Sequence, residues 1–97
     1  MVISNKAIFF DRDGVLIEAP VNKQKKPLSV KKVDEVKICE GVEEICKKYR
    51  HDFYLIMITN QPDLQRKKNT KKNIENINLF IKKKLNLNDI FVCYSDD

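Results

Sequence analysis

The sequence predicts an α/β fold in which three parallel strands alternate with two helices. Three apolar runs, at 7–10, 53–58 and 90–94, have the length and composition of strands. Two segments between them, 42–49 and 70–85, repeat apolar residues at the spacing of one helix face. This strand–helix–strand–helix–strand order is typical of a parallel sheet with right-handed crossovers.

The first strand leads directly into a pair of carboxylates. Because residues 7–10 are continuously apolar, we expect a strand that is buried on both faces. Asp11 and Asp13 follow, and Gly14 begins a turn. Ligands of open α/β sheets bind beyond the carboxyl ends of the strands. Two carboxylates this close repel each other unless a cation or a shared proton offsets them, so the pattern suits a magnesium-assisted phosphoryl-transfer site.

The segment after this turn is predicted to be a flap. Residues 17–37 contain two prolines and six lysines and few apolar residues, which favours a loop over a linker between domains. A first helix is expected over 42–49. Its apolar stripe is formed by Val42, Ile45, Cys46 and Tyr49.

The second strand is predicted to end in polar residues. The run 53–58 is followed by Thr59 and Asn60, whose hydroxyl, amide and backbone N–H groups can bind phosphate oxygens, and Pro62 stops the strand. Thr70 is a suitable N-cap for a second helix that extends to Leu85. The residues of this helix expected to face inward are Ile74, Ile77, Ile81 and Leu85.

Length and composition indicate one small domain over residues 1–97, with no second domain. No run approaches eighteen apolar residues, and no signal-peptide pattern is present, so we expect a soluble, cytoplasmic protein without a membrane partner. The three cysteines are odd in number and form no CxxC pair, which favours a reducing compartment over a disulfide framework.

The formal charge of +5 is concentrated late in the chain. Residues 65–84 contain eight Lys or Arg against one acid, Glu75. This composition fits a solvated helix face, or attraction of an anionic substrate or nucleic acid. Because aromatic residues for base stacking and a known nucleic-acid module are both lacking, we expect no nucleic-acid partner.

Two segments carry a resemblance to a known family. FFDRDGVL at 9–16 and LIMITNQ at 55–61 resemble motifs one and two of the haloacid dehalogenase-like (HAD) phosphohydrolases. The chain is most similar there to the group of histidinol-phosphatases and D-glycero-D-manno-heptose 1,7-bisphosphate phosphatases, which also matches Glu40-Gly41-Val42 and Arg66. The resemblance implies a Rossmann-like, three-layer α/β/α fold, of which this chain would hold the first three strands and two helices.

The resemblance also implies roles for individual residues. Asp11 would be the nucleophile and a ligand of Mg²⁺, the expected cofactor. Asp13 would be the general acid/base and would bind the metal through its backbone carbonyl. The positions implied to bind substrate or its phosphate are Thr59, Asn60, Gln61, Arg66 and Lys68.

The activity implied is hydrolysis of a small phosphorylated metabolite, a sugar bisphosphate or histidinol phosphate, through an aspartyl-phosphate. Two alternatives stay open. One is a polynucleotide 3′-phosphatase, supported only by the basic residues at 66–84. The other is an inactive fragment that only binds phosphate, metal or a partner protein.

The chain also departs from the pattern of this group. The third motif, a lysine, and the fourth, an acidic residue, would lie beyond Asp97, so we expect a fragment of a longer protein. In the group's strand order the strand that carries Asp11 is central. Without its missing neighbour it becomes an exposed edge, through which the chain could form an oligomer.

Two further positions differ. Lys67 stands where the group usually has glycine. Cys93 matches the first ligand of a zinc loop found in many members, but Ser95 stands where a histidine would follow. A lone Cys93 cannot build a four-ligand zinc site, so we expect no zinc there and a small, buried strand residue instead.

Overall fold

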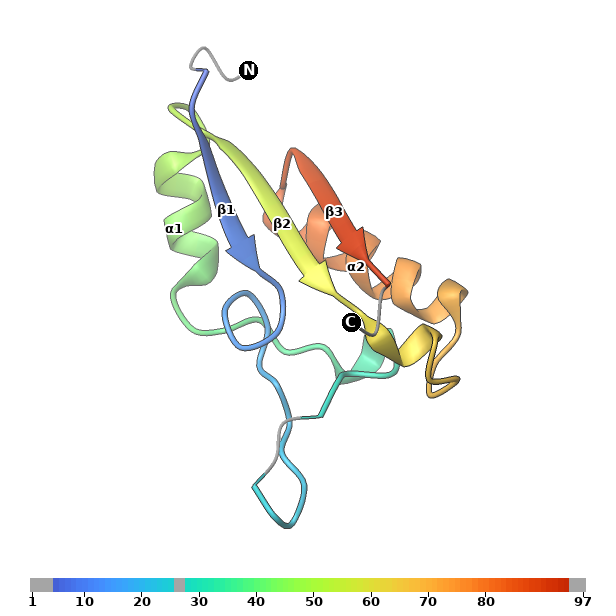
Figure 1. Cartoon of the computed structure of the whole chain (residues 1–97). Coiled ribbons are helices and arrows are strands. Elements are labelled where there is room, and N and C mark those ends of the chain that lie inside the picture. The colour runs from blue at the N-terminus through green and yellow to red at the C-terminus, as the bar shows by residue number, and fades with distance from the viewer. Residues whose placement is uncertain (1–4, 26–27, 95–97) are drawn as a thin grey trace.

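A computed structural model describes residues 5–25 and 28–94 of the chain (Figure 1). It contains three strands, two α-helices and two short 3-10 helices. In chain order these are β1 (Ala7–Asp11), η1 (Val33–Glu35), α1 (Val42–Tyr49), β2 (Tyr54–Asn60), η2 (Pro62–Leu64), α2 (Lys71–Leu85) and β3 (Asp89–Cys93).

The three strands form one parallel sheet in the order β1-β2-β3, which confirms the predicted fold class. Asp11 at the end of β1 pairs with Ile58, and Asn60 at the end of β2 pairs with Cys93. The register therefore brings the carboxyl ends of all three strands to one edge of the sheet. The predicted sites at Asp11 and at Thr59-Asn60 lie on this edge.

Both helices pack on the same face of the sheet and share one hydrophobic core (Figure 1). The α2 residues predicted to face inward are all buried, and so are Val42 and Cys46 of α1. The centre of the core comes from β2, whose Leu55 and Met57 are fully buried. The predicted bounds of both helices agree with the structure, including Thr70 as the N-cap of α2.

Ile45 was predicted to face the core but is 47% exposed. Neighbouring residues of a helix are about 100° apart around its axis. Because Cys46 points into the core, Ile45 is turned to the flank of α1. The apolar stripe of this short helix is thus wider than the surface it covers.

The prediction of a first strand buried on both faces is wrong. Burial alternates along β1, and Phe9 is 58% exposed. With strands in consecutive order, two right-handed crossovers place both helices on one face. No described helix covers the other face, so the third layer is not formed by the described residues. The exposed apolar side chains of this face are Phe9, Tyr54, Ile58 and Phe91.

The predicted flap begins with a tight turn and returns beside its own start. The backbone N–H of Glu18 donates to the Lys37 carbonyl at 2.8 Å, and that of Leu28 donates to the Pro20 carbonyl at 2.7 Å. An ion pair between Lys31 and Asp63 ties the base of the flap to η2. Figure 1 shows the flap extending away from the carboxyl edge of the sheet. Among the described residues no helix is long and apolar enough to cross a bilayer.

Candidate active site

A cavity of about 380 Å³ opens at the carboxyl edge of the sheet. The ends of all three strands line it, because the parallel register brings them level. Its polar lining comes from Asp11, Thr59, Asn60 and Cys93, and its apolar lining from Ile58, Phe91 and Val92. Three of the residues predicted for the site therefore surround one space.

Asp11 is an exposed carboxylate at the last position of β1. Its carboxylate oxygens have no hydrogen bond or ion pair with any described residue. The chain turns directly after it. The backbone N–H of Arg12 still donates to Ile58 of β2 at 3.1 Å, and Gly14 then takes a φ of +83°, which glycine adopts without strain. This turn leaves the Asp11 carboxylate open to the cavity.

Asp13 is held by the side chains of its neighbours. Its Oδ2 accepts from Arg12 Nε at 3.2 Å and from Gln61 Nε2 at 3.0 Å. Its Oδ1 accepts from Arg12 Nη2 at 3.1 Å. The Arg12 side chain is fully buried, whereas that of Asp13 is 28% exposed. Asp13 is thus fixed in direction while part of it stays accessible.

Gln61 connects the ends of the strands. Its side chain is buried, and Nε2 donates both to Asp13 Oδ2 and to Thr59 Oγ1, the latter at 2.6 Å. Its backbone N–H donates to the Cys93 carbonyl at 2.7 Å. The prediction that Gln61 binds substrate stays a prediction. In this structure its amide links Asp13 to the cavity wall at Thr59.

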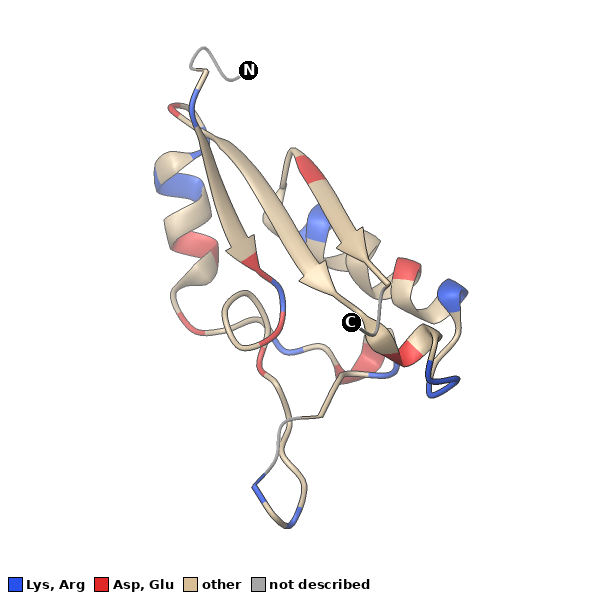
Figure 2. Ribbon diagram, viewed as in Figure 1, with Lys and Arg blue, Asp and Glu red and all other residues tan. Residues whose placement is uncertain are grey.

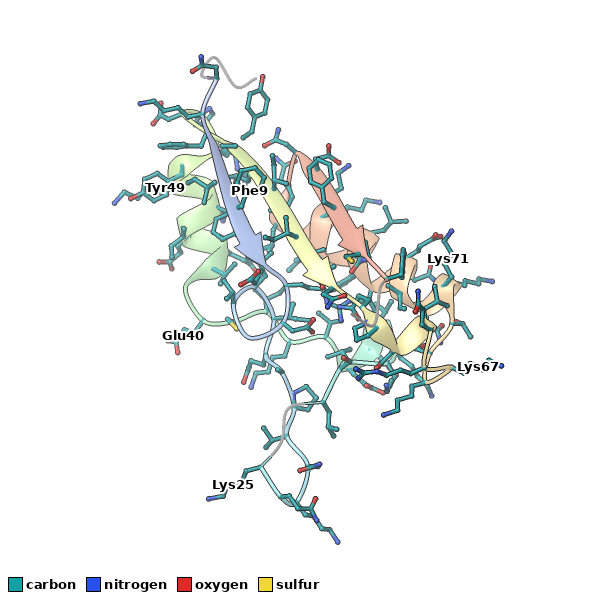
Figure 3. All side chains as sticks on the ribbon, in the orientation of Figure 1. Phe9, Lys25, Glu40, Tyr49, Lys67 and Lys71 are labelled. Atoms are coloured by element: carbon teal, nitrogen blue, oxygen red, sulfur yellow. The ribbon has the colours of Figure 1, made fainter. Side chains whose placement is uncertain are left out.

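Arg66 and Lys68 are exposed and do not line the cavity. They lie in the loop after η2, where the Lys68 N–H donates to the Asp63 carbonyl at 2.8 Å. Lys67 between them has a φ of +58°, the left-handed region that favours glycine. That conformation explains why glycine is usual here. The Lys67 side chain points outward at this end of the molecule (Figure 3).

The prediction that Cys93 is a buried strand residue is wrong, since it is exposed and lines the cavity. It ends an edge strand, and its side chain lies on the sheet face that no described helix covers. Ser95, the position compared with a zinc-binding histidine, lies outside the described residues. Within residues 5–25 and 28–94 no group of three or more His, Cys, Asp or Glu side chains could hold a metal ion.

The described residues nevertheless supply part of the set of oxygen ligands that a Mg²⁺ ion requires. Mg²⁺ prefers oxygen ligands and is often bound by one or two carboxylates, with water and substrate phosphate completing its shell. Asp11 supplies an exposed carboxylate without a described partner, next to the Thr59 hydroxyl and the Asn60 amide. A single carboxylate with neighbouring neutral oxygens matches that mode of binding.

Sequence reasoning missed Arg12 and Asn78. Arg12, the residue after β1, donates from Nη1 to Oδ1 of Asn78 in the middle of α2 at 3.0 Å. Asn78 lies between Ile77 and Ile81 in the inward stripe of α2 and is buried. The sequence did contain one signal for Asn78, namely an amide at an inward-facing position of a predicted helix. Buried polar groups require hydrogen-bond partners, so such an amide indicates a polar contact in the core.

No known family profile matches the chain, but comparison with known proteins found similar ones, of which two are described here. The D-glycero-α-D-manno-heptose-1,7-bisphosphate 7-phosphatase of Campylobacter jejuni is 37% identical over 65 residues, which are 66% of this chain and 34% of that protein. A crystal structure of D,D-heptose 1,7-bisphosphate phosphatase from B. bronchiseptica, complexed with magnesium and phosphate, superimposes with a TM-score of 0.73. It is 25% identical, and the match covers 95% of this chain and 52% of the other.

The parallel sheet and these matches define the class of fold as HAD-like, and the resemblance seen in the sequence is confirmed. Within that class the chain is similar to heptose bisphosphate phosphatases. It spans about a third of the curated relative's length and about half of the solved structure.

Proposed function

We propose that the protein is a magnesium-dependent phosphatase that hydrolyses a small phosphorylated metabolite. A sugar bisphosphate is the favoured substrate and histidinol phosphate the other candidate. The observation that carries the proposal is the Asp11 carboxylate, which faces a cavity bordered by Thr59 and Asn60 and has no described partner. The names of the two similar proteins support a phosphorylated sugar.

The reaction assigned to these residues has two steps. An Asp11 oxygen attacks phosphorus, the bond to the substrate oxygen breaks, and Asp13 gives that oxygen its proton. Asp13 then accepts a proton from water, whose oxygen attacks the aspartyl-phosphate and releases phosphate and the Asp11 carboxylate. The Thr59 hydroxyl and the Asn60 amide donate hydrogen bonds to phosphate oxygens. Bound Mg²⁺ would supply charge neutralisation for the phosphoryl oxygens.

The loop that carries Arg66 and Lys68 can also take part in substrate binding. Both side chains lie outside the cavity, on the loop that follows β2 and its η2 turn. From there they can attract the anionic substrate and contact its distal groups. The ion pair between Lys31 and Asp63 brings the base of the flap to the same loop, so both segments can contribute to substrate choice.

The test is hydrolysis of p-nitrophenyl phosphate and of a sugar bisphosphate, with and without Mg²⁺. We expect turnover that EDTA removes and Mg²⁺ restores, and that Asp11→Asn reduces to the rate of buffer alone. Asp52→Asn, the same change at an exposed loop position, is the matched control. Turnover that survives Asp11→Asn would refute the assignment. Absence of turnover would favour the inactive, phosphate-binding alternative.

The charge distribution argues against a polynucleotide substrate. Because α2 runs antiparallel to the strands, Lys71 and Lys72 lie near the site edge, whereas Lys82–Lys84 lie at the opposite end of the helix (Figure 2). A helix of this length spans about 22 Å. The lysines of α2 thus form two separate groups, one at each end of the helix. A 3′-phosphorylated oligonucleotide should be hydrolysed much more slowly than a phosphosugar.

A further inference from the structure

We propose that Asn78, acting through Arg12, is a positioning residue for Asp13. This inference rests on the proposed phosphatase function, in which Asp13 protonates the leaving oxygen. It concerns a side chain in the middle of α2, outside the cavity and outside both sequence motifs. The contact that carries it is the hydrogen bond from Arg12 Nη1 to Asn78 Oδ1 at 3.0 Å.

Arg12 has one planar guanidinium and uses two of its edges. The Nε and Nη2 donors face the two oxygens of Asp13, at 3.2 and 3.1 Å, in a bidentate pair. The remaining nitrogen, Nη1, faces Asn78. Because a guanidinium is rigid and planar, holding Nη1 fixes the direction of the other two nitrogens. Asn78 therefore determines where the fork points.

The orientation of the Asn78 amide follows from the same contact. Arg12 has only donors, so the oxygen of the amide must face it. The amide nitrogen of Asn78 is then buried without a partner among the described residues. A buried unsatisfied N–H is unfavourable, commonly by about 1–3 kcal/mol. If position 78 served only apolar packing, we would expect isoleucine or leucine there, as at Ile74, Ile77 and Ile81.

The burial of Asn78 and Arg12 also excludes solvent from the hydrogen bond between them. Asn78 is 3% exposed and Arg12 is 1% exposed. Water therefore cannot easily replace the Asn78 amide oxygen as the acceptor for Arg12. The position of α2 thus determines, through Asn78 and Arg12, where Asp13 is held. Gln61 holds the other side of the same carboxylate. Together these contacts restrict Asp13 from the helix side and from the end of β2.

The test uses the dependence on leaving group, because only a poor leaving group needs a proton. An alkyl phosphate, such as a sugar phosphate, requires general acid catalysis, which contributes about 10²–10⁴-fold. The p-nitrophenolate group leaves without protonation. We expect Asn78→Ala to lower kcat/KM for the sugar phosphate about tenfold, because the variant would lose part of the contribution from general acid catalysis. For p-nitrophenyl phosphate we expect kcat/KM to fall less than about twofold. Arg12→Lys, which loses the fork, should show the same selectivity.

Asn76→Ala is the matched control, because Asn76 is an exposed asparagine on the same helix. Equal losses on both substrates in Asn78→Ala would indicate a structural role and overturn the proposal, as would no loss on either. Asp11→Asn separates the two claims. If turnover survives Asp11→Asn, the phosphatase assignment fails. If Asp11→Asn abolishes turnover but Asn78→Ala shows no selectivity, only the positioning role fails.

A second measurement needs no turnover. In ¹⁵N- and ¹³C-edited NMR spectra, the Arg12 Nε–H signal and the Asp13 carboxyl carbon report the bidentate pair directly. We expect Asn78→Ala to broaden or shift both signals and Asn76→Ala to leave them unchanged. Unchanged Arg12 and Asp13 signals in a folded Asn78→Ala protein would overturn the proposal even if the chain is inactive.

Discussion

At the scale of single residues, the two aspartates that follow β1 have different surroundings. Asp11 faces the cavity without a described partner, whereas Asp13 accepts three hydrogen bonds from Arg12 and Gln61. A nucleophile must reach its target freely, and an acid/base must be held in a fixed direction. The contacts of the two carboxylates thus match the two roles proposed for them.

The cysteines give a prediction that depends on burial. Burial raises the pKa of the Cys46 thiol above its ordinary value, Arg50 opposes this shift and Glu43 adds to it. Cys46 is therefore covered and keeps its proton to a higher pH than an ordinary thiol does, whereas Cys93 is exposed. In a timed reaction with a disulfide reagent at pH 8, we expect Cys93 to react first and Cys46 only after unfolding.

Cys93→Ser should remove the fast phase of this reaction, and Cys46→Ser should leave it intact. The raised pKa also has a consequence for stability. The folded state keeps the Cys46 proton at a pH where the unfolded chain has lost it. This contribution is therefore present below the ordinary pKa of a thiol and is lost as the pH rises through the raised pKa of the folded state. A fast phase assigned to Cys46 would contradict the buried position.

At the scale of elements, the sequence predicted the helices better than the surroundings of the strands. The bounds of α1 and α2 follow from local signals, namely apolar periodicity and the Thr70 cap. The exposure of β1 depends instead on which face the crossovers cover, and this is a property of the whole sheet. Likewise the contact between Arg12 and Asn78 joins residues 66 positions apart, which no local pattern specifies.

The cap of α2 can be tested by substitution. The Thr70 Oγ1 accepts from the backbone N–H of Asn73 at 3.1 Å, so Thr70→Ala leaves that N–H without its partner. We expect a loss of about 1 kcal/mol in the free energy of unfolding, measured by urea denaturation. Thr70→Ser keeps the oxygen and should retain most of the stability. Equal stability of the alanine and wild-type proteins would contradict the capping role.

At the scale of the whole molecule, the two faces of the sheet differ strongly. One face packs against both helices, and the other presents aromatic and aliphatic side chains that no described residue covers. The cavity of the candidate site opens at the edge between these faces, with Phe91 and Ile58 among its lining residues. The apolar sheet face is therefore continuous with the candidate site.

Exposed apolar patches promote association of proteins in water. We expect the 97-residue polypeptide to self-associate as its concentration rises, as judged by sedimentation velocity. Phe91→Thr, which keeps strand propensity but removes an aromatic ring that is 55% exposed, should reduce this association. Leu79→Thr removes a side chain that is 60% exposed on α2 and is the control. An equal effect of both changes would show that the sheet face is not the associating surface.

In the proposed reaction Asp11 carries the phosphoryl group. The most direct test of this role is acid quenching of the protein during turnover with Mg²⁺ and substrate, followed by borohydride reduction of the acyl-phosphate and mass spectrometry of the peptides. We expect that Asp11 alone is reduced, and only in samples that contained both substrate and Mg²⁺. Reduction at another carboxylate, or phosphate release with Asp11 unmodified at every quench time, would contradict it.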